Sequence, residues 1–465
     1  MDSFSIEKTE FLKKAGDIAF EREHRRRINS NIEKYDIAVS KGKQLYANIE
    51  LAKRKASAIK HKVINHLEHQ LLEFEKNFDD NGGKVIWALD AEAAVREVRA
   101  IIKRESVSMV VKSKSMVTEE IGLNKYLKNK KVEVFESDLG EFIVQQAGQQ
   151  PYHIVTPAMH LVKEDIAELF HNKFSLHKNS SPADIALFVR KYFREKFKQS
   201  EINITGANFL IAETGSVVLT ENEGNGLLSA SLPKIHIVIT GIEKIIPTLG
   251  DLEHFLPLLA THATGQRLSA YNSIINGPRR QGENDGPEEM YVILIDNGRT
   301  NLLEQHVQRR ALACIRCGAC LNACPVYKNI GGHAYGVPYS GPIGAVIMPF
   351  MKKFQNYIHL SYASSLCGRC TDVCPVKINL HELLLFNRNS SVQQKNYTRT
   401  DKFVFRIWKN LMLNRKRLDF IGVGAKNKLI KHFFSKSWGS RRTLPHFQKK
   451  RFGAIWDEHK YEDPD

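Results

Sequence analysis

Seven cysteines, confined to residues 314–374 of a 465-residue chain, have the spacing that points most directly to chemistry. Disulfide-forming cysteines would be scattered along the chain, and a reducing compartment would keep them free. The first run reads Cys314-Ile-Arg-Cys317-Gly-Ala-Cys320-Leu-Asn-Ala-Cys324-Pro325. The second run reads Cys367-Gly-Arg-Cys370-Thr-Asp-Val-Cys374-Pro375. It lacks the first cysteine of the pattern, and Ser364 stands where that cysteine would be.

The first run has the spacing C-x2-C-x2-C-x3-C-P, which is typical of bacterial two-cluster ferredoxins. In that pattern three thiolates surround one cluster, and the fourth, turned away by the longer gap and the proline, binds the other cluster. The predicted ligands of cluster 1 are Cys314, Cys317, Cys320 and Cys374. The predicted ligands of cluster 2 are Cys324, Cys367 and Cys370. Zinc ribbons also use paired C-x2-C, but zinc does not need the x3-C-P element twice. The sequence therefore predicts two iron–sulfur clusters, with [4Fe-4S] as the expected type.

The fourth corner of cluster 2 has no cysteine in the sequence, and several alternatives stay open. A three-iron cluster, [3Fe-4S], needs only three thiolates. A four-iron cluster could instead bind the hydroxyl of Ser364 or Ser365, a water, a small ligand or a partner's cysteine. Thiolates suit iron–sulfur clusters better than hydroxyls do. The other reading of Ser364 is that it caps the turn before the second run.

Composition predicts a folded chain of several segments around these cysteines. Hydrophobic residues make up 42% and charged residues 26%, which is typical of a globular protein. Residues 1–80 show helical spacing of apolar residues, with Arg25–Arg27 as an expected solvated face, and form a helical N-terminal extension. Residues 81–300 are predicted to be an α/β domain, residues 301–390 a helical two-cluster ferredoxin-like domain, and residues 391–465 a basic tail.

The α/β domain is expected to contain a largely parallel sheet, because short β-rich runs alternate with helical patterns. The strands are expected at Lys84–Ala88, Met109–Val111, Lys131–Glu136, Phe209–Ile211, Ser216–Leu219, Ile235–Thr240 and Tyr291–Ile295. The helices between them are expected at Ala91–Arg104, Ala183–Phe197 and Ile245–Leu259.

The positive charge is concentrated near the C-terminus. The whole chain has a formal net charge of +17, and residues 391–465 contain 18 Lys and Arg against 7 Asp and Glu. In this tail Phe403, Phe405 and Trp408 alternate with Lys402, Arg406 and Lys409. This pattern favours docking to a protein partner, with an anionic membrane surface as the second reading. No helix-turn-helix, zinc-finger or RNA-binding signature accompanies it, so nucleic acid is not the expected partner.

No apolar run approaches the roughly 18 residues that a membrane-spanning helix needs. The first residues lack a basic stretch followed by an apolar core, so we expect no signal peptide. A cytoplasmic location is therefore the expectation.

Motifs along most of the chain resemble those of the bacterial lactate-utilisation iron–sulfur proteins that form the lactate utilisation protein B family. In the α/β domain the matching stretches are Lys112-Ser-Lys-Ser-Met116, Thr118-Glu-Glu120, Gly206-Ala-Asn-Phe-Leu-Ile-Ala-Glu-Thr-Gly-Ser216 and Pro233-Lys-Ile-His236. In the cysteine-containing region they are Cys314–Pro325, Gly331-Gly-His-Ala-Tyr-Gly336, Tyr339-Ser-Gly-Pro-Ile-Gly344, Ser364-Ser-Leu-Cys-Gly-Arg-Cys370 and Cys374-Pro-Val-Lys. The family also has only three cysteines in its second run.

The resemblance implies a multi-protein system that oxidises L-lactate to pyruvate. In it this chain would be a non-catalytic electron-transfer component, beside a second iron–sulfur protein and a small α/β protein. It also implies an α/β domain like that of sugar isomerases and CoA-transferases. The chain has no G-x-G-x-x-G after a strand, hence no sign of a nicotinamide or flavin site of that kind. The alternative is an iron–sulfur enzyme that binds a 2-hydroxy acid itself, at its α/β pocket or at the open cluster corner.

Other residues have weaker functional readings. On a CoA-transferase-like fold Glu213 could be a nucleophile, or it could merely cap a turn beside Gly215. The stretch Lys112–Ser115 follows a strand and could bind an anion, although a solvated loop is favoured. The loop Thr220–Gly226 could cover a pocket. Packing is favoured for His333, Tyr335 and Tyr339 between the cysteine runs, and a structural role for His153, His160, His236 and His262.

Overall fold

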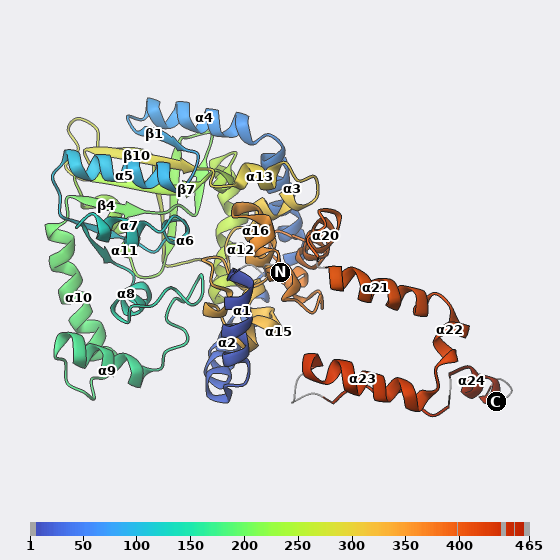
Figure 1. Ribbon diagram of the computed structural model, residues 1–465. Coiled ribbons are helices and arrows are strands. Elements are labelled where there is room, and N and C mark those ends of the chain that lie inside the picture. The colour runs from blue at the N-terminus through green and yellow to red at the C-terminus, as the bar shows by residue number, and fades with distance from the viewer. Residues whose placement is uncertain (1–5, 398, 439–442, 451, 460–465) are drawn as a thin grey trace. The chain divides into compact units, whose positions relative to one another are not determined.

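The structure is a computed structural model that describes residues 6–397, 399–438, 443–450 and 452–459 (Figure 1). These residues divide into two compact units, of which the first ends at Gln394 and the second begins at Lys395. The first unit contains both sheets and every cysteine. The finer boundaries at residues 80, 300 and 390 stay predictions.

A parallel sheet lies at the centre of the α/β domain, as the sequence predicts (Figure 1). Within residues 84–295, all of which the structure describes, its six strands run in the order β1-β10-β7-β4-β2-β3. They are β1 (Lys84–Ala88), β2 (Met109–Lys112), β3 (Glu133–Glu136), β4 (Ile202–Thr205), β7 (Ile235–Gly241) and β10 (Glu289–Ile295). Each neighbouring pair is parallel, which requires the crossover helices that the sequence places between the strands.

The sheet is covered on both faces, which explains why its central strands read as nearly continuous apolar runs. Ile237 and Ile293 pack on one face against α5 (Ala91–Arg104) and α7 (Leu123–Asn129). Val238, the next residue along β7, packs on the other face with the second sheet and with α4 (Leu67–Asp80). The period of two along each strand thus divides the core into two layers.

A second, smaller sheet was not expected from the sequence. Within the described residues 209–275 its four strands run in the order β8-β5-β6-β9. They are β5 (Phe209–Ile211), β6 (Ser216–Glu221), β8 (Ile245–Ile246) and β9 (Tyr271–Ile275). The prediction of a helix from Ile245 is wrong at its start, because Ile245 and Ile246 pair with β5. A capping box between Thr248 and Asp251 then leads into α12 (Leu252–Thr264).

The N-terminal helices connect the α/β domain to the cysteine-containing region. They are α1 (Ile6–Ala19), α2 (Arg22–Lys43), α3 (Ile49–Asn65) and α4. Helix α2 packs against both α12 and α15 (Pro325–Ile330). The expectation of a solvated Arg25–Arg27 face holds for Arg26, which is exposed. It is wrong for the other two, because Arg25 donates to Asn329 and Arg27 pairs with Asp165 at 2.8 Å.

Short helices and loops complete the first unit. On the α/β side they are α6 (Met116–Glu120), α8 (Leu139–Gln146), α9 (Lys163–Phe174), α10 (Pro182–Gln199), α11 (Asn225–Ser231) and the 3-10 helices η1 (Ile242–Lys244) and η2 (Leu249–Asp251). In the cysteine-containing region they are α13 (Arg299–Leu303), η3 (Gln308–Ala313), α14 (Ala319–Ala323), α15, η4 (His333–Tyr335), α16 (Gly341–Met351), α17 (Phe354–Tyr357), α18 (His359–Tyr362), α19 (Arg369–Asp372) and α20 (Leu380–Gln393).

The second unit is helical and leaves large apolar side chains exposed. Its helices are α21 (Arg399–Met412), α22 (Arg415–Phe420), α23 (Val423–Trp438) and α24 (Phe452–His459). Phe405 is 67% exposed and Trp408 is 56% exposed, on a helix that also presents Lys402, Arg406 and Lys409. Among the described residues no helix is both long and apolar enough to cross a bilayer.

Buried neutral histidines give the first unit a testable pH dependence. His236 is fully buried and shares a hydrogen bond of 2.8 Å with the Thr205 hydroxyl, and burial lowers its pKa to about 3. Below pH 6.5 the unfolded chain takes up a proton on this ring and the folded protein does not. We therefore expect His236 to lower the free energy of unfolding by about 1.4 kcal/mol for each unit by which the pH is decreased from about 6.5 to about 3.

The measurement is the urea midpoint at several pH values for wild type and His236→Gln. In the variant the free energy of unfolding should lose the part of its pH dependence that comes from His236, whatever the stability of the variant at pH 7.5. His69→Gln, at an exposed position, is the matched control and should keep the wild-type slope. An unchanged slope in His236→Gln would contradict the prediction.

Candidate iron–sulfur site

The first cysteine run lies on a loop and two short helices that follow the last strand of the parallel sheet. Cys314 comes directly after η3, Cys320 lies in α14, and Cys324 precedes α15. Pro325 occupies the first turn of α15, where its missing N–H costs nothing and its fixed φ starts the helix. The backbone N–H of Arg316 donates to Cys314 Sγ at 3.4 Å.

The second run repeats the backbone of the first. Arg316 and Leu366, each directly before a cysteine, have φ values of +60° and +55°, and Gly318 and Gly368, each directly after it, have +78° and +81°. The Ser364 hydroxyl oxygen accepts the N–H of Leu366 at 3.1 Å, just as Cys314 Sγ accepts the N–H two residues on. Ser364 therefore stands in the structural place of Cys314 and also caps its turn.

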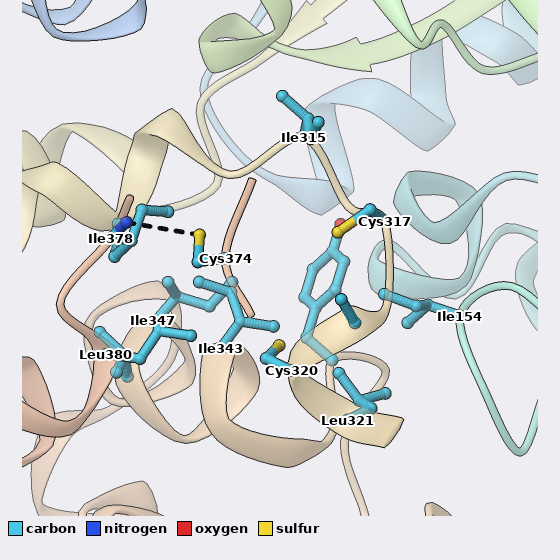
Figure 2. Close-up of a cluster of buried hydrophobic side chains, with 14 of the residues drawn as sticks. Ile154, Ile315, Cys317, Cys320, Leu321, Ile343, Ile347, Cys374, Ile378 and Leu380 are labelled. Carbon is cyan, nitrogen blue, oxygen red and sulfur yellow. Dashed lines mark hydrogen bonds between the residues drawn. The ribbon is translucent and has the colours of Figure 1, made fainter. Parts of the chain in front are cut away.

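Cysteines of the second run lie close to cysteines of the first. Figure 2 shows Cys317 and Cys320 of the first run and Cys374 of the second around a common space. Burial raises the pKa of Cys317, and the neighbouring Cys314 and Cys374 thiolates raise it further. Burial likewise raises the pKa of Cys370 to about 11, and Cys324, from the first run, adds to it. Metal binding must therefore displace protons from buried thiols.

The two groups of cysteines have different surroundings. A Cβ added at Gly318 would meet Val155 and His153 at 3.0 Å, so the first run is packed against the α/β domain. A Cβ added at Gly368 would meet nothing within 4 Å. Cys367 is exposed, whereas Cys314 is half-buried and the other five, Cys317, Cys320, Cys324, Cys370 and Cys374, are buried. The pKa of Cys367 is lowered by the backbone N–H of Arg369 and the Ser365 hydroxyl.

A buried network of charges connects the first run to the sheet. Arg299 donates to both carboxylate oxygens of Glu120 at 2.9 and 2.8 Å and to Glu243. Glu243 also pairs with Arg316 at 3.2 Å. Tyr339 donates to Glu120 at 2.7 Å, and its ring lies 4.3 Å from the Arg316 guanidinium. Sequence reasoning missed Glu243 and Arg299; the signal was a charged pair, Glu243-Lys244, inside an apolar run.

Cations outnumber carboxylates in this network. Lys60 donates to the carbonyls of Glu243 and Ile245, and burial lowers its pKa to about 7. Burial and then Arg316 lower the pKa of Lys244 to about 8. Although burial opposes it, the Cys314 thiolate raises the pKa of Arg316. An anionic cluster held by four thiolates fits beside these cations, since buried charge needs a counter-charge.

The Gly-rich loop between the runs is held mainly by packing. Gly331 and Gly332 are required because a Cβ at either would collide with Tyr152. His333 donates to the Gln150 carbonyl at 2.7 Å. Tyr335 is buried, and after burial the Cys324 thiolate is the largest cause of its raised pKa, so its ring lies near the cysteines.

The other histidines singled out from the sequence have structural partners. His153 accepts the N–H groups of Val155 and Thr156. His160 bonds Gln149, and His262 donates to the Leu258 carbonyl. These contacts agree with the favoured structural role.

The favoured solvated-loop reading of Lys112–Ser115 is wrong. Lys112 is fully buried at the end of β2, 2.9 Å from Glu136 and 3.4 Å from Glu119. Burial raises the pKa of Glu136 and of nearby Glu141. Glu119 and Glu136 are therefore already paired with the ammonium group of Lys112.

Glu213 has the geometry of a turn cap rather than of a nucleophile. Its side chain is exposed and accepts the N–H of Leu249 at 2.9 Å. Gly215 has φ +61°, and a Cβ there would meet the Phe78 nitrogen at 2.3 Å. The turn thus requires glycine for its conformation and for its close approach to α4.

Two protein families match separate parts of the chain. The LUD domain matches residues 71–295, which contain the parallel sheet. The 4Fe-4S dicluster domain matches residues 310–378, which contain all seven cysteines, so this region is an iron–sulfur domain. A crystal structure of a DUF162 family protein from Deinococcus radiodurans aligns with 50% of this chain and 98% of its own, at 14% identity and a TM-score of 0.28, too low to inform the fold.

Curated relatives match most of the chain. Lactate utilization protein B of Shouchella clausii is 42% identical over 81% of this chain and 79% of its own length. The proteins of the same name from Bacillus velezensis and Bacillus subtilis are each 45% identical, over 73% and 72% of this chain and 71% and 70% of their own lengths. The cysteine region, the parallel sheet and this identity together show that the chain belongs to the lactate utilization protein B family.

Proposed function

We propose that this chain is the iron–sulfur electron-transfer subunit of a multi-protein system that oxidises L-lactate to pyruvate. The observation that carries the proposal is the pair of cysteine groups, one enclosed against the α/β domain and one that reaches the surface at Cys367. A subunit that exchanges electrons with a partner protein needs one cluster close to its surface, and Cys367 places cluster 2 there. The relatives' name supplies lactate as the substrate of the system.

Cluster 1 is proposed to be held by Cys314, Cys317, Cys320 and Cys374. Cluster 2 is proposed to be held by Cys324, Cys367 and Cys370, with its fourth corner near Ser364. When bound, clusters of this type take up and release one electron at a time. The proposed partners are a second iron–sulfur protein and a small α/β protein, and the basic helices after residue 395 are a candidate docking segment.

The chain's own residues determine how readily an electron is accepted. The N–H groups of Arg316 and Ile378 donate to the sulfurs of Cys314 and Cys374, at 3.4 and 3.3 Å, which stabilises added negative charge. Buried Lys60 and Lys244 act in the same direction, as does Arg316, whose side chain is 11% exposed. Both effects favour reduction of cluster 1 over reduction of a cluster in an apolar cavity.

The test starts with iron and acid-labile sulfide, with EPR before and after dithionite, on anaerobically purified full-length protein. About eight irons with a fast-relaxing signal on reduction would support two four-iron clusters. About seven irons with a three-iron signal when oxidised would leave the relay intact with an incomplete second cluster. Stoichiometric zinc without iron would overturn the proposal.

The second half of the test adds L-lactate. Alone, the protein should show no reduction of its clusters by lactate, and with the companion proteins it should be reduced. Reduction by lactate in the isolated chain would replace the relay with an enzyme that handles the substrate itself.

Ser364→Cys tests the open corner of cluster 2. Since Ser364 occupies the structural place of Cys314, a thiolate there should complete a four-cysteine set. We expect ferricyanide to remove the corner iron of cluster 2 in wild type, which the three-iron EPR signal would report, and we expect cluster 2 of the variant to resist this loss. Ser108→Cys, at an exposed position of the α/β domain, is the control and should behave as wild type. Equal behaviour of the two variants would contradict the assignment.

A further inference from the structure

The helices after residue 394 carry many large apolar side chains and no core that buries them. Among the side chains of this second unit that the structure describes, none is buried. Phe405, Trp408, Phe433 and Trp456, which come from three different helices, are each more than half exposed. Folding normally removes such side chains from water, so these surfaces are suited to a partner that covers them.

Helix α21 has an apolar side and a basic side. With 3.6 residues per turn, Lys402, Arg406 and Lys409 fall on one side of the helix. The rest of its circumference carries the apolar residues, which are Phe403, Val404, Phe405, Ile407, Trp408, Leu411 and Met412. The one acidic residue in its sequence, Asp401, lies in the first turn, where the helix dipole favours a carboxylate. The helix therefore presents cations along the edge of a wide apolar surface.

The other long helices of the unit have exposed apolar faces too. In α23, Leu429 and Phe433 lie one turn apart and are exposed, and the exposed Lys431 lies on the opposite side. In α24, the rings of Phe452 and Trp456 stack with their centroids 5.9 Å apart, and both side chains are exposed. Three separate helices thus present apolar side chains to solvent.

The sequence favours a protein partner for this segment, whereas the structure favours a membrane surface. A protein groove typically accepts the apolar face of one amphipathic helix. Here the apolar residues are distributed over three helices, and a bilayer surface can accept all of them. Tryptophan and phenylalanine beside lysine and arginine are typical of helices that lie in the bilayer interface. The 18 Lys and Arg against 7 Asp and Glu in residues 391–465 complement anionic lipid headgroups.

We propose that α21, together with α23 and α24, binds the surface of a membrane that contains anionic phospholipids. Phe405 and Trp408 insert between the headgroups, and Lys402, Arg406 and Lys409 contact the lipid phosphates. Because α21 has 14 residues, too few to cross the hydrocarbon core, it lies along the surface. This binding does not depend on the proposed electron-transfer function, and it brings the iron–sulfur domain of the same chain to a membrane.

The experiment is flotation of the full-length, cluster-loaded protein with vesicles of phosphatidylglycerol and phosphatidylcholine in roughly equal parts. Vesicles of phosphatidylcholine alone are the uncharged comparison. The protein should bind the anionic vesicles about tenfold more tightly than the uncharged ones, because each cation near an anionic surface adds to the affinity. Salt at about 1 M should weaken the binding, because it screens these charges.

Two variants separate the apolar contribution from the charged one. Phe405→Ser with Trp408→Ser should weaken binding to the anionic vesicles about tenfold or more, because the apolar area that enters the bilayer is lost. Lys402→Gln with Arg406→Gln and Lys409→Gln should weaken it by about the same factor and should reduce its salt dependence.

The matched controls make the same kinds of change at exposed positions of the first unit. They are Leu89→Ser with Leu187→Ser, and Lys103→Gln with Lys125→Gln and Lys128→Gln. Both should bind vesicles as wild type does. All four proteins should keep the iron content of wild type, because every cysteine lies in the first unit.

No binding to anionic vesicles, or binding that is unaltered in the Phe405 and Trp408 variant, overturns the proposal. Equal binding to anionic and uncharged vesicles refutes the role of the cations. If the companion proteins bind wild type but not that variant, and vesicles bind neither, the helices are a protein-docking segment instead. Self-association that the variant loses, in the absence of vesicle binding, would assign the apolar faces to a second copy of this chain.

Discussion

Combined replacement of Cys314 and Cys374 by alanine is expected to remove one cluster and leave the other intact, although 60 positions separate them. The reason is that both thiols are proposed ligands of cluster 1, and the Cys314 thiolate lies close enough to Cys374 to raise its pKa beyond the effect of burial. The variant should retain about four of about eight irons per chain and the EPR signal of cluster 2. Iron analysis measures the iron content, and EPR of the reduced protein shows which cluster remains.

The control is Cys324→Ala with Cys374→Ala, which takes one thiol from each proposed set. It should damage both clusters and leave well under half of the iron. If each run instead held its own cluster, Cys314 and Cys374 would be ligands of different clusters. Replacing both would then damage both clusters. Loss of both clusters in the Cys314 and Cys374 variant would therefore refute the crosswise assignment.

Arg299→Met is expected to lower the free energy of unfolding by about 3–5 kcal/mol. Its guanidinium is buried and is shared between Glu120 and Glu243, so its removal leaves two buried carboxylates without their main counter-charge. Arg299→Lys should also destabilise, by less, because an ammonium group cannot bond both oxygens of Glu120 and Glu243 together. Urea unfolding of the cluster-loaded protein, followed by circular dichroism, measures both.

The matched control is Arg96→Met, which breaks an exposed pair with Glu92 on α5 and should cost no more than about 0.5 kcal/mol. Wild-type stability of Arg299→Met would contradict the prediction. The same variant should shift the EPR signal of cluster 1, because Arg299 holds Glu243 and Glu243 holds Arg316. Arg299→Lys provides this readout if the methionine variant does not fold.

The parallel sheet was predictable because its strands are apolar on both faces and alternate with amphipathic helices. Each of the expected strands overlaps an observed one to within a residue or two, and Ala91–Arg104 matches α5. β4 was missed because Asn203 interrupts a four-residue strand, and β9 because its side chains are largely exposed. The helix expected from Ile245 failed because pairing with β5 overrides local helical spacing.

The buried charges were beyond sequence reasoning for a different reason. Lys112 reads as part of a polar loop, Lys-Ser-Lys-Ser, and only Glu136 and Glu119, brought to it by neighbouring elements, make its burial tolerable. In the same way Glu120, Glu243 and Arg299 come from segments more than 50 residues apart. Ionic networks depend on distances between segments, which local patterns do not encode.

The sequence by itself determined the cofactor chemistry, because cluster ligation depends on thiols at fixed short intervals that a local motif contains completely. The same spacing also predicted how the ligands divide between the two clusters and that Ser364 stands where a cysteine would be. Tertiary structure alone decided that Ser364 repeats the turn of Cys314 and that Cys367 is exposed. It also decided that Lys114 and residues of the loop Thr220–Gly226 line one cavity. These are relations between segments distant in the chain, and packing rather than spacing brings them together.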